Sequence, residues 1–106
     1  MIADIRNQFG LTDRDIKTIN SIFAQYPEVE EAKLFGSRAK GNHSFGSDID
    51  LAIINEGVSL KTVSRLAADF EESTLPYKVD IVNLPSLKHE ELAEHVRRVG
   101  VAFYRK

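Results

Sequence analysis

Hydrophobic and polar residues alternate along the chain in periods that predict helices and strands in turn. The apolar positions from Ile16 to Tyr26 recur at a helical spacing, and Pro27 ends the segment. Thr12 precedes them as an N-cap, with Asp15 at the fourth position of a capping box. We therefore predict an amphipathic helix that begins after Thr12 and ends before Pro27.

Two later segments and one earlier segment share this helical period. Ser59 is predicted to cap the first of the later helices and Ser86 the second, which ends at Gly100. The inward positions of these two helices are predicted to be Leu60, Val63, Ala67, Phe70, Leu92, Val96 and Val99. A shorter helical face at the start of the chain is made by Ile2, Ile5 and Phe9 and ends at Gly10.

Four segments are predicted to be strands: residues 32–35, 48–54, 77–82 and 101–104. Residues 49–54 are apolar at nearly every position, so both faces of this strand must be covered and the strand is central. Strands that alternate with helices predict an α/β (α+β) fold, with one mixed β-sheet of three to four strands packed with helices. We expect a single domain over residues 1–106.

Composition narrows the class of protein. The net charge is −2, without the basic excess of a nucleic-acid-coating protein, so direct DNA binding is not expected. The sequence has no cysteine, which excludes a disulfide scaffold, a thiolate zinc site and a cysteine nucleophile. The start of the chain does not resemble a signal peptide, and no apolar run approaches the roughly 20 residues that span a bilayer. We expect a cytoplasmic protein without a membrane partner.

Three aspartates stand beside or within apolar strands, where charge is unexpected. Asp48 and Asp50 begin the central strand, and Asp80 lies inside the strand at 77–82. Side chains two residues apart on a strand share a face, and unpaired carboxylates at that range repel unless a cation lies between them. Oxygen ligands of this kind suit Mg²⁺ or Mn²⁺. If the two strands are neighbours, the three carboxylates could hold metal for phosphoryl displacement.

A glycine motif precedes the aspartates. Gly36 allows a sharp turn and a close approach of the backbone to a ligand. Ser37 and the N–H groups after it are candidates to receive phosphate oxygens, in a connection that is long enough for a short helix or a loop. Arg38 and Lys40 in the same segment are candidates to neutralise a triphosphate.

Each of these features alone has an ordinary explanation. An Asp-x-Asp pair or a Gly-Ser pair is common in solvated turns, and Asp80 could simply pair with Lys78. The histidines lack the spacing of helical metal ligands and are predicted to be surface residues: His43, His89 and His95. The order and spacing of the three features together favour a phosphoryl-transfer site.

The two motifs together closely resemble the signature of the DNA polymerase beta-like nucleotidyltransferase superfamily. The first runs Leu34-Phe35-Gly36-Ser37-Arg38-Ala39-Lys40-Gly41 and the second Ser47-Asp48-Ile49-Asp50-Leu51-Ala52-Ile53. The short chain is similar to the minimal nucleotidyltransferase (MNT) group, antitoxins that act beside a HEPN-domain toxin. The resemblance implies the polymerase beta-like nucleotidyltransferase fold.

The resemblance also implies roles for individual residues. Asp48 and Asp50 would bind Mg²⁺ or Mn²⁺, and Asp80 would complete the site and help to activate the acceptor hydroxyl. Residues implied to hold the nucleoside triphosphate are Gly36, Ser37, Arg38 and Ser47. The expected reaction transfers AMP from ATP to a tyrosine hydroxyl of a partner HEPN toxin.

Two alternatives stay open at this point. The chain could neutralise a partner by contact alone, using apolar residues such as Ile2, Ile5 and Phe9, with the aspartates kept as a nucleotide-binding site. It could also transfer a nucleotide to a small molecule. Whether the chain forms a homo-oligomer is left open as well.

Overall fold

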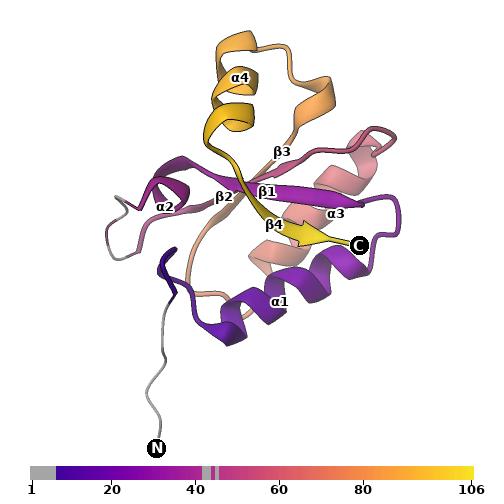
Figure 1. The fold of residues 1–106 in the computed structure, drawn as a ribbon. Coiled ribbons are helices and arrows are strands. Elements are labelled where there is room, and N and C mark those ends of the chain that lie inside the picture. The colour runs from indigo at the N-terminus through magenta and orange to yellow at the C-terminus, as the bar shows by residue number, and fades with distance from the viewer. Residues whose placement is uncertain (1–6, 42–43, 45) are drawn as a thin grey trace, which may run out of the picture.

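A four-stranded sheet lies at the centre of the computed structural model, which describes residues 7–41, 44 and 46–106 (Figure 1). In chain order the elements are α1 (Asp13–Ala24), β1 (Glu31–Phe35), α2 (Gly36–Lys40), β2 (Ile49–Ile53), α3 (Leu60–Glu71), β3 (Val79–Asn83), the 3₁₀ helix η1 (Leu84–Ser86), α4 (Glu90–Val99) and β4 (Val101–Arg105). Within the described ranges, no helix combines the length and the apolar character needed to cross a bilayer.

The strand order across the sheet is β3-β2-β1-β4. β1 is antiparallel to β2 and β4, whereas β2 is parallel to β3. A parallel pair needs a crossover connection, and α3 provides it. The predicted mixed sheet is therefore confirmed, with β2 in a central position and residues 101–105 as an edge strand.

The larger core lies between the sheet and helices α1 and α3, which cover the same face (Figure 1). Every second residue of β2 points into it, and Leu51 there is fully buried. Phe23 of α1 contacts Phe70 of α3 edge to face, with ring centroids 5.5 Å apart, and stacks on Tyr104 of β4 at 5.0 Å. These contacts join both helices to the sheet.

Helix α4 covers the opposite face of the sheet with a smaller apolar cluster (Figure 1). The cluster is made by Phe35, Ala52, Leu84, Ala93 and Val96. Because β2 sends Ala52 into this cluster and Leu51 into the larger core, it is buried on both faces. That is the arrangement predicted from its nearly continuous apolar sequence.

Two of the predicted helix caps are confirmed. Thr12 forms the reciprocal capping box: its N–H donates to Asp15 Oδ2 at 3.1 Å, and the Asp15 N–H donates to Thr12 Oγ1 at 3.0 Å. Ser59 Oγ accepts from the N–H of Thr62 at 3.2 Å at the start of α3. These contacts join residues three positions apart, which is why the sequence reveals them.

The predicted cap at Ser86 is wrong. Ser86 ends η1, which has a proline near its start, and α4 begins only at Glu90. The N-cap is His89, whose Nδ1 accepts from the N–H of Leu92 at 3.1 Å. A ring nitrogen replaces the expected hydroxyl because the 3₁₀ turn moves the start of the helix along the chain.

The predicted inward stripe of α3 is partly wrong. Leu60 is 81% exposed and Ala67 is also exposed, whereas Thr62 and Leu66 are buried together with Phe70. The buried residues follow an i, i+4 spacing that includes a threonine, so the true stripe is turned relative to the most apolar one. The hydroxyl of Thr62 is satisfied by Ser59, which makes its burial inexpensive.

The helix predicted at the start of the chain is wrong for residues 7–10, the part of it that the structure describes. Ile2 and Ile5 lie outside the described residues, and residues 7–10 form a turn instead of helix. Asn7 Oδ1 accepts from the N–H groups of Phe9 at 2.8 Å and Leu11 at 3.2 Å, which stabilises the turn. Phe9 packs partly buried against the larger core, so it is not the exposed docking residue suggested above.

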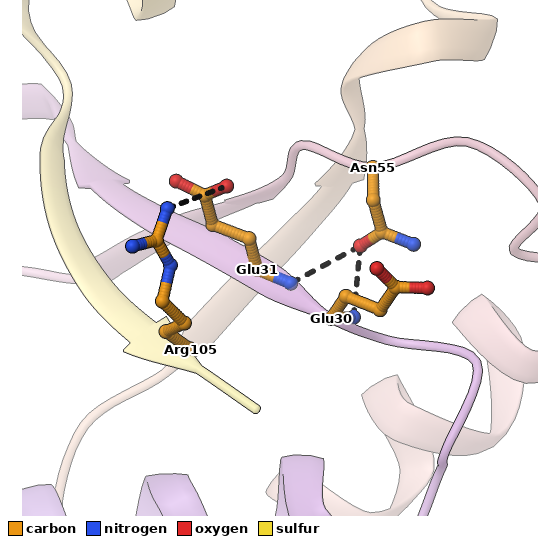
Figure 2. Close-up of polar contacts among 4 residues, drawn as sticks. All are labelled: Glu30, Glu31, Asn55 and Arg105. Carbon is orange, nitrogen blue, oxygen red and sulfur yellow. Dashed lines mark hydrogen bonds and ion pairs between the residues drawn. The ribbon is translucent and has the colours of Figure 1, made fainter.

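The end of the sheet far from Asp50 is held by the side chain of Asn55, which bonds backbone groups of β1 and the residue before it (Figure 2). Asn55 Oδ1 accepts from the N–H groups of Glu30 at 2.9 Å and Glu31 at 3.1 Å, where β1 begins. Arg105 of β4 pairs with Glu31 at 3.8 Å on the surface. The opposite end, where β1 runs into α2, carries the two sequence motifs.

Candidate active site

Asp50 and Asp80 lie side by side on neighbouring strands. β2 and β3 are parallel, and their register pairs Asp50 with Asp80. Paired residues on adjacent strands point to the same face, with their backbones about 4.8 Å apart. Ala52 and Val82, two residues further along the same strands, belong to the cluster beneath α4, so both aspartates face the α4 side. The expected adjacency of the two strands is confirmed.

Asp48 directly precedes β2, so the strand begins one residue later than predicted. Its side chain is exposed, whereas those of Asp50 and Asp80 are half-buried. Lys78 forms an ion pair with Asp80 at 3.9 Å, and the two side chains are 73% and 47% exposed. The pair is long and solvated, so it leaves the Asp80 carboxylate available to other ligands.

The three carboxylates share one electrostatic environment. Burial raises the pKa of the Asp50 carboxyl above its ordinary value, and the negative charges of Asp80 and Asp48 raise it further. The Arg38 guanidinium acts in the opposite direction and lowers this pKa. A cation placed among the carboxylates would remove the repulsion that makes ionised Asp50 unfavourable.

Gly36 brings the glycine motif directly against Asp50. Phe35 pairs with Asp50 in the sheet, and Gly36 follows it with φ +78°, a conformation that other residues rarely adopt. A Cβ atom on Gly36 would collide with Asp50 Oδ2 and lie 3.1 Å from its Cγ. The position therefore requires glycine both for its backbone angle and for the room that the carboxylate takes.

The motif continues as the short helix α2. Its N-cap, Phe35, provides no side-chain hydrogen bond, so the first N–H groups of the helix keep their capacity for an external acceptor. Ser37 is half-buried in the first turn and Lys40 is exposed in the last. The connection that the sequence left open as a short helix or a loop begins with a short helix, and the phosphate contacts of Gly36 and Ser37 stay predictions.

Arg38 points into the protein and is only 2% exposed. Its Nε and Nη2 donate to the carbonyl oxygen of Ser47 at 3.1 and 2.7 Å, and its Nη1 donates to that of Phe9 at 2.7 Å. The guanidinium carbon lies 4.4 Å from the ring centroid of Tyr77. The structure therefore directs the guanidinium inward, and the triphosphate contact expected of Arg38 has no support in its geometry.

Ser47 belongs to the turn that leads into the aspartate motif. Its Oγ accepts from the N–H of Ser44 at 2.9 Å, and its own N–H donates to the Ser44 carbonyl at 3.1 Å. The hydroxyl thus stabilises the turn, and its contact with a nucleotide stays a prediction. Asn42 and His43 of this connection lie outside the described residues.

The donor set fits a hard divalent cation such as Mg²⁺ or Mn²⁺. Asp48, Asp50 and Asp80 provide carboxylate oxygens, and the pKa of Asp50 is raised first by burial and then by the negative charges of the other two. In the described part of the chain, no three acidic or histidine side chains already stand close enough to form a metal site. An ion bound here would have to draw the three carboxylates closer together.

Comparison with known proteins shows the family of this chain. Residues 17–106 match the family model "Polymerase beta, Nucleotidyltransferase". The chain belongs to this family. The probable protein adenylyltransferase MntA of Haemophilus influenzae is 32% identical over 100 residues, which cover 93% of this nucleotidyltransferase and 87% of that relative.

Solved structures show the same fold. A crystal structure of a toxin–antitoxin with AMP-PNP has a TM-score of 0.71 at 26% identity, over 87% of this nucleotidyltransferase and 74% of that chain. A crystal structure of a mutant of the toxin–antitoxin MntA-HpeT has a TM-score of 0.66 at 26% identity, over 91% and 74% of the two chains. The predicted nucleotidyltransferase fold and enzyme class are thereby confirmed.

The sequence did not reveal two contributors to this region of the nucleotidyltransferase. Tyr77 contacts the Arg38 guanidinium through its ring, and Phe9 contributes only a backbone carbonyl. Any residue type can provide a backbone carbonyl, so the sequence could not reveal the contact of Phe9 with Arg38. Tyr77 carried one weak signal, an aromatic residue just before a strand, which is equally typical of core packing.

Proposed function

We propose that this chain transfers AMP from ATP to a tyrosine hydroxyl of a HEPN-domain toxin and thereby acts as its antitoxin. The observation that supports this proposal most directly is that Asp50 and Asp80 are paired on neighbouring strands, next to Gly36, in a chain of the nucleotidyltransferase family. The name of the Haemophilus influenzae relative supports protein as the acceptor class. The toxin–antitoxin neighbours support a toxin as the partner, and the one with AMP-PNP supports an adenine nucleotide as the donor.

In the proposed reaction the acceptor oxygen attacks the α-phosphorus of ATP. A bond from the α-phosphorus to the acceptor oxygen forms, the bond to the bridging oxygen of the β-phosphate breaks, and pyrophosphate leaves. Asp48 and Asp50 would hold Mg²⁺ or Mn²⁺, which when bound neutralises charge on the triphosphate. Asp80 would complete the site and accept the proton that the acceptor hydroxyl loses.

The start of α2 is the proposed phosphate contact. Gly36 and Ser37 present backbone N–H groups there, next to the Asp50 carboxylate. Such groups receive phosphate oxygens, while the metal offsets the charge of the neighbouring carboxylate. The two motifs then hold opposite sides of one triphosphate.

The exposure of the site supports an acceptor carried by another protein. Asp48 is exposed, and the Asp80 side chain keeps 47% of its surface open to solvent. A tyrosine on a partner surface needs such an open approach, because its side chain extends only a few ångströms beyond the backbone that carries it.

The test is label transfer to a purified HEPN-domain toxin, the proposed partner. With Mg²⁺ and ATP labelled at the α-phosphate, the wild type should label the toxin, and ATP labelled at the γ-phosphate should not. Asp50→Asn should lower the rate at least about a hundredfold, since even indirect partners of metal ligands contribute 10- to 100-fold. Asp13→Asn, an exposed position in the first turn of α1, serves as the matched control and should keep the rate.

Three outcomes would contradict the proposal. Unlabelled toxin together with protection by Asp50→Asn would indicate neutralisation by contact alone. Label on an added small-molecule acceptor but not on the toxin would indicate a different acceptor class. Label that survives a Tyr→Phe change at every exposed tyrosine of the toxin would reject tyrosine as the acceptor.

A further inference from the structure

Arg38 connects three segments that are distant in sequence. It lies in α2, and its guanidinium reaches the carbonyl oxygens of Ser47 and Phe9 while facing the ring of Tyr77. The side chain is 2% exposed, so all of these contacts are made away from bulk water. A buried guanidinium is costly unless its donors are satisfied, and here they meet two carbonyl oxygens.

The contact with Ser47 acts directly on the aspartate motif. The Ser47 carbonyl belongs to the peptide group that joins Ser47 to Asp48, and this group is planar through the Cα atom of Asp48. Two donors of one rigid guanidinium fix that oxygen, at 3.1 and 2.7 Å. Because this oxygen is held, the plane of the Ser47–Asp48 peptide group is held as well. The orientation of the backbone at Asp48, where the chain enters β2, is thereby restricted.

The same side chain also belongs to the glycine motif. Arg38 follows Gly36 by two residues, and Gly36 lies against the Asp50 carboxylate. The guanidinium thus links the helix that would receive phosphate to the turn that presents the proposed metal ligands. Within the described part of the chain, the guanidinium points inward and makes no hydrogen bond to the aspartates, although its charge lowers the pKa of Asp50.

We propose that Arg38 is a positioning residue, whose bonds to the Ser47 and Phe9 carbonyls and contact with Tyr77 hold Asp48 for divalent-metal binding. The inference rests on the metal site of the proposed function. It differs from the role expected from the sequence, because Arg38 acts through the backbone of Ser47 and touches neither phosphate nor metal. Lysine cannot replace it, since one ammonium group lacks the planar fork that serves two carbonyls on different segments.

The test is Mn²⁺ binding to the full-length protein, measured without nucleotide or partner by the loss of the free-ion electron paramagnetic resonance signal. Arg38→Lys should raise the Mn²⁺ dissociation constant about tenfold or more, the effect typical of residues that orient metal ligands. Arg105→Lys is the matched control and should bind Mn²⁺ like the wild type, because Arg105 lies at the other end of the sheet. Circular dichroism and a thermal melt must show each variant to be folded at the temperature used.

Label transfer gives a second measurement that separates positioning from loss of folded protein. For folded Arg38→Lys, the Mg²⁺ concentration at half-maximal rate should rise while the KM for ATP stays within about threefold of the wild type, because the N–H groups of α2 are unchanged. An Mn²⁺ dissociation constant within twofold of the wild type in folded Arg38→Lys would overturn the proposal.

If Arg38→Lys does not fold, the Mn²⁺ affinity of Tyr77→Leu tests the proposal instead. Leucine keeps an apolar side chain but removes the ring that faces the guanidinium, so a two- to fivefold weaker Mn²⁺ affinity is expected, on the order of a cation–π contact. Unchanged affinity in this variant would overturn the proposal.

Failure of the proposed function gives a different result from failure of this inference. A wild type that binds Mn²⁺ but labels no toxin contradicts only the acceptor, and the Arg38 variants still test the positioning role. A wild type that binds no Mn²⁺ contradicts both.

Discussion

The two faces of the sheet share the same strands but carry different kinds of residues. On the side of α1 and α3, β2 presents Ile49, Leu51 and Ile53, all fully buried. On the side of α4, the same strand presents Asp50 and Ala52. On the α1 and α3 side, β2 is apolar at all three of these positions. On the α4 side, it changes within two residues from a half-buried carboxylate to a residue of the small apolar cluster.

The difference shows how a chain of 106 residues can keep like charges together. The repulsion among Asp48, Asp50 and Asp80 opposes folding in the absence of a cation. The larger core on the opposite face offsets this cost, because burial of apolar surface is the main favourable contribution to folding. We therefore expect changes on the α1 and α3 face to act on stability and changes at the aspartates to act on function.

The largest effect on stability is expected for Leu51→Ala in the larger core. Leu51 is fully buried between two helices and the sheet, so its loss should cost about 3–5 kcal/mol of unfolding free energy. Leu84→Ala in the cluster beneath α4 should cost less, about 2 kcal/mol, since Leu84 is 7% exposed and its surroundings can relax. Urea denaturation of both variants compares them, and a larger loss at Leu84 would contradict the proposed division between the faces.

The second-largest effect on stability is expected from the binding of nucleotide and metal together. A ligand that binds only the folded state at a hundredfold excess over its dissociation constant adds about 2.7 kcal/mol. Millimolar MgATP should therefore raise the melting temperature of the wild type but not that of Asp50→Asn. An unchanged melting temperature in the wild type would contradict a working site on the α4 face.

Gly36→Ala should affect both stability and function. Alanine at φ +78° is strained, and its Cβ would collide with the Asp50 carboxylate. We expect a loss of about 1–3 kcal/mol of stability together with weaker MgATP binding. Gly57→Ala is a suitable control, because Gly57 has a similar backbone angle but open space around it, so it should lose stability without losing MgATP binding.

A smaller effect is expected from the titration of Asp50 in metal-free protein. Its pKa is raised in the folded state, so the folded protein binds the proton more tightly than the unfolded chain does. The stability associated with the protonated form is fully present below the unfolded pKa of 3.8 and is lost as pH rises through the folded pKa. Asn imitates the protonated carboxyl, so Asp50→Asn should be more stable than the wild type at pH 7 and lose this advantage at low pH.

Thermal melts from pH 3 to pH 8 in a chelator would measure this advantage. Equal melting temperatures of the wild type and Asp50→Asn throughout that range would contradict the raised pKa of Asp50, which burial and the neighbouring carboxylates cause. With MgATP present the order at pH 7 should reverse, because only the wild type is expected to gain from the ligand.

The smallest effect is expected for Lys78→Gln. The ion pair with Asp80 spans 3.9 Å and both side chains are largely exposed, so its loss should change the unfolding free energy by less than about 0.5 kcal/mol. Label transfer should also stay within about twofold of the wild type. A large loss of activity would instead give Lys78 a part in the site, which the described geometry does not suggest.

Local features of the fold were predictable wherever the deciding contact joins residues a few positions apart. The capping box of Thr12, the cap at Ser59 and the turn at Gly36 follow from such short spacings. The cap of α4 was not predictable, because η1 moves the start of the helix to His89. The exposed position of Leu60 depends on how α3 is rotated against the sheet, which packing decides.

The sequence by itself determined the composition of the candidate site: a glycine motif, the Asp48 and Asp50 pair, and a third acidic residue on an apolar strand. The tertiary structure decided that Asp80 pairs with Asp50 and that Arg38 turns inward to the Ser47 carbonyl. The register of Asp50 and Asp80 joins segments 30 residues apart, and the direction of Arg38 depends on Phe9, 29 residues away, as well as on Ser47, nine residues away. These pairings are set by the packing of the whole sheet. The residue types determine which functional groups the site can contain, whereas long-range packing determines which of these groups lie next to one another.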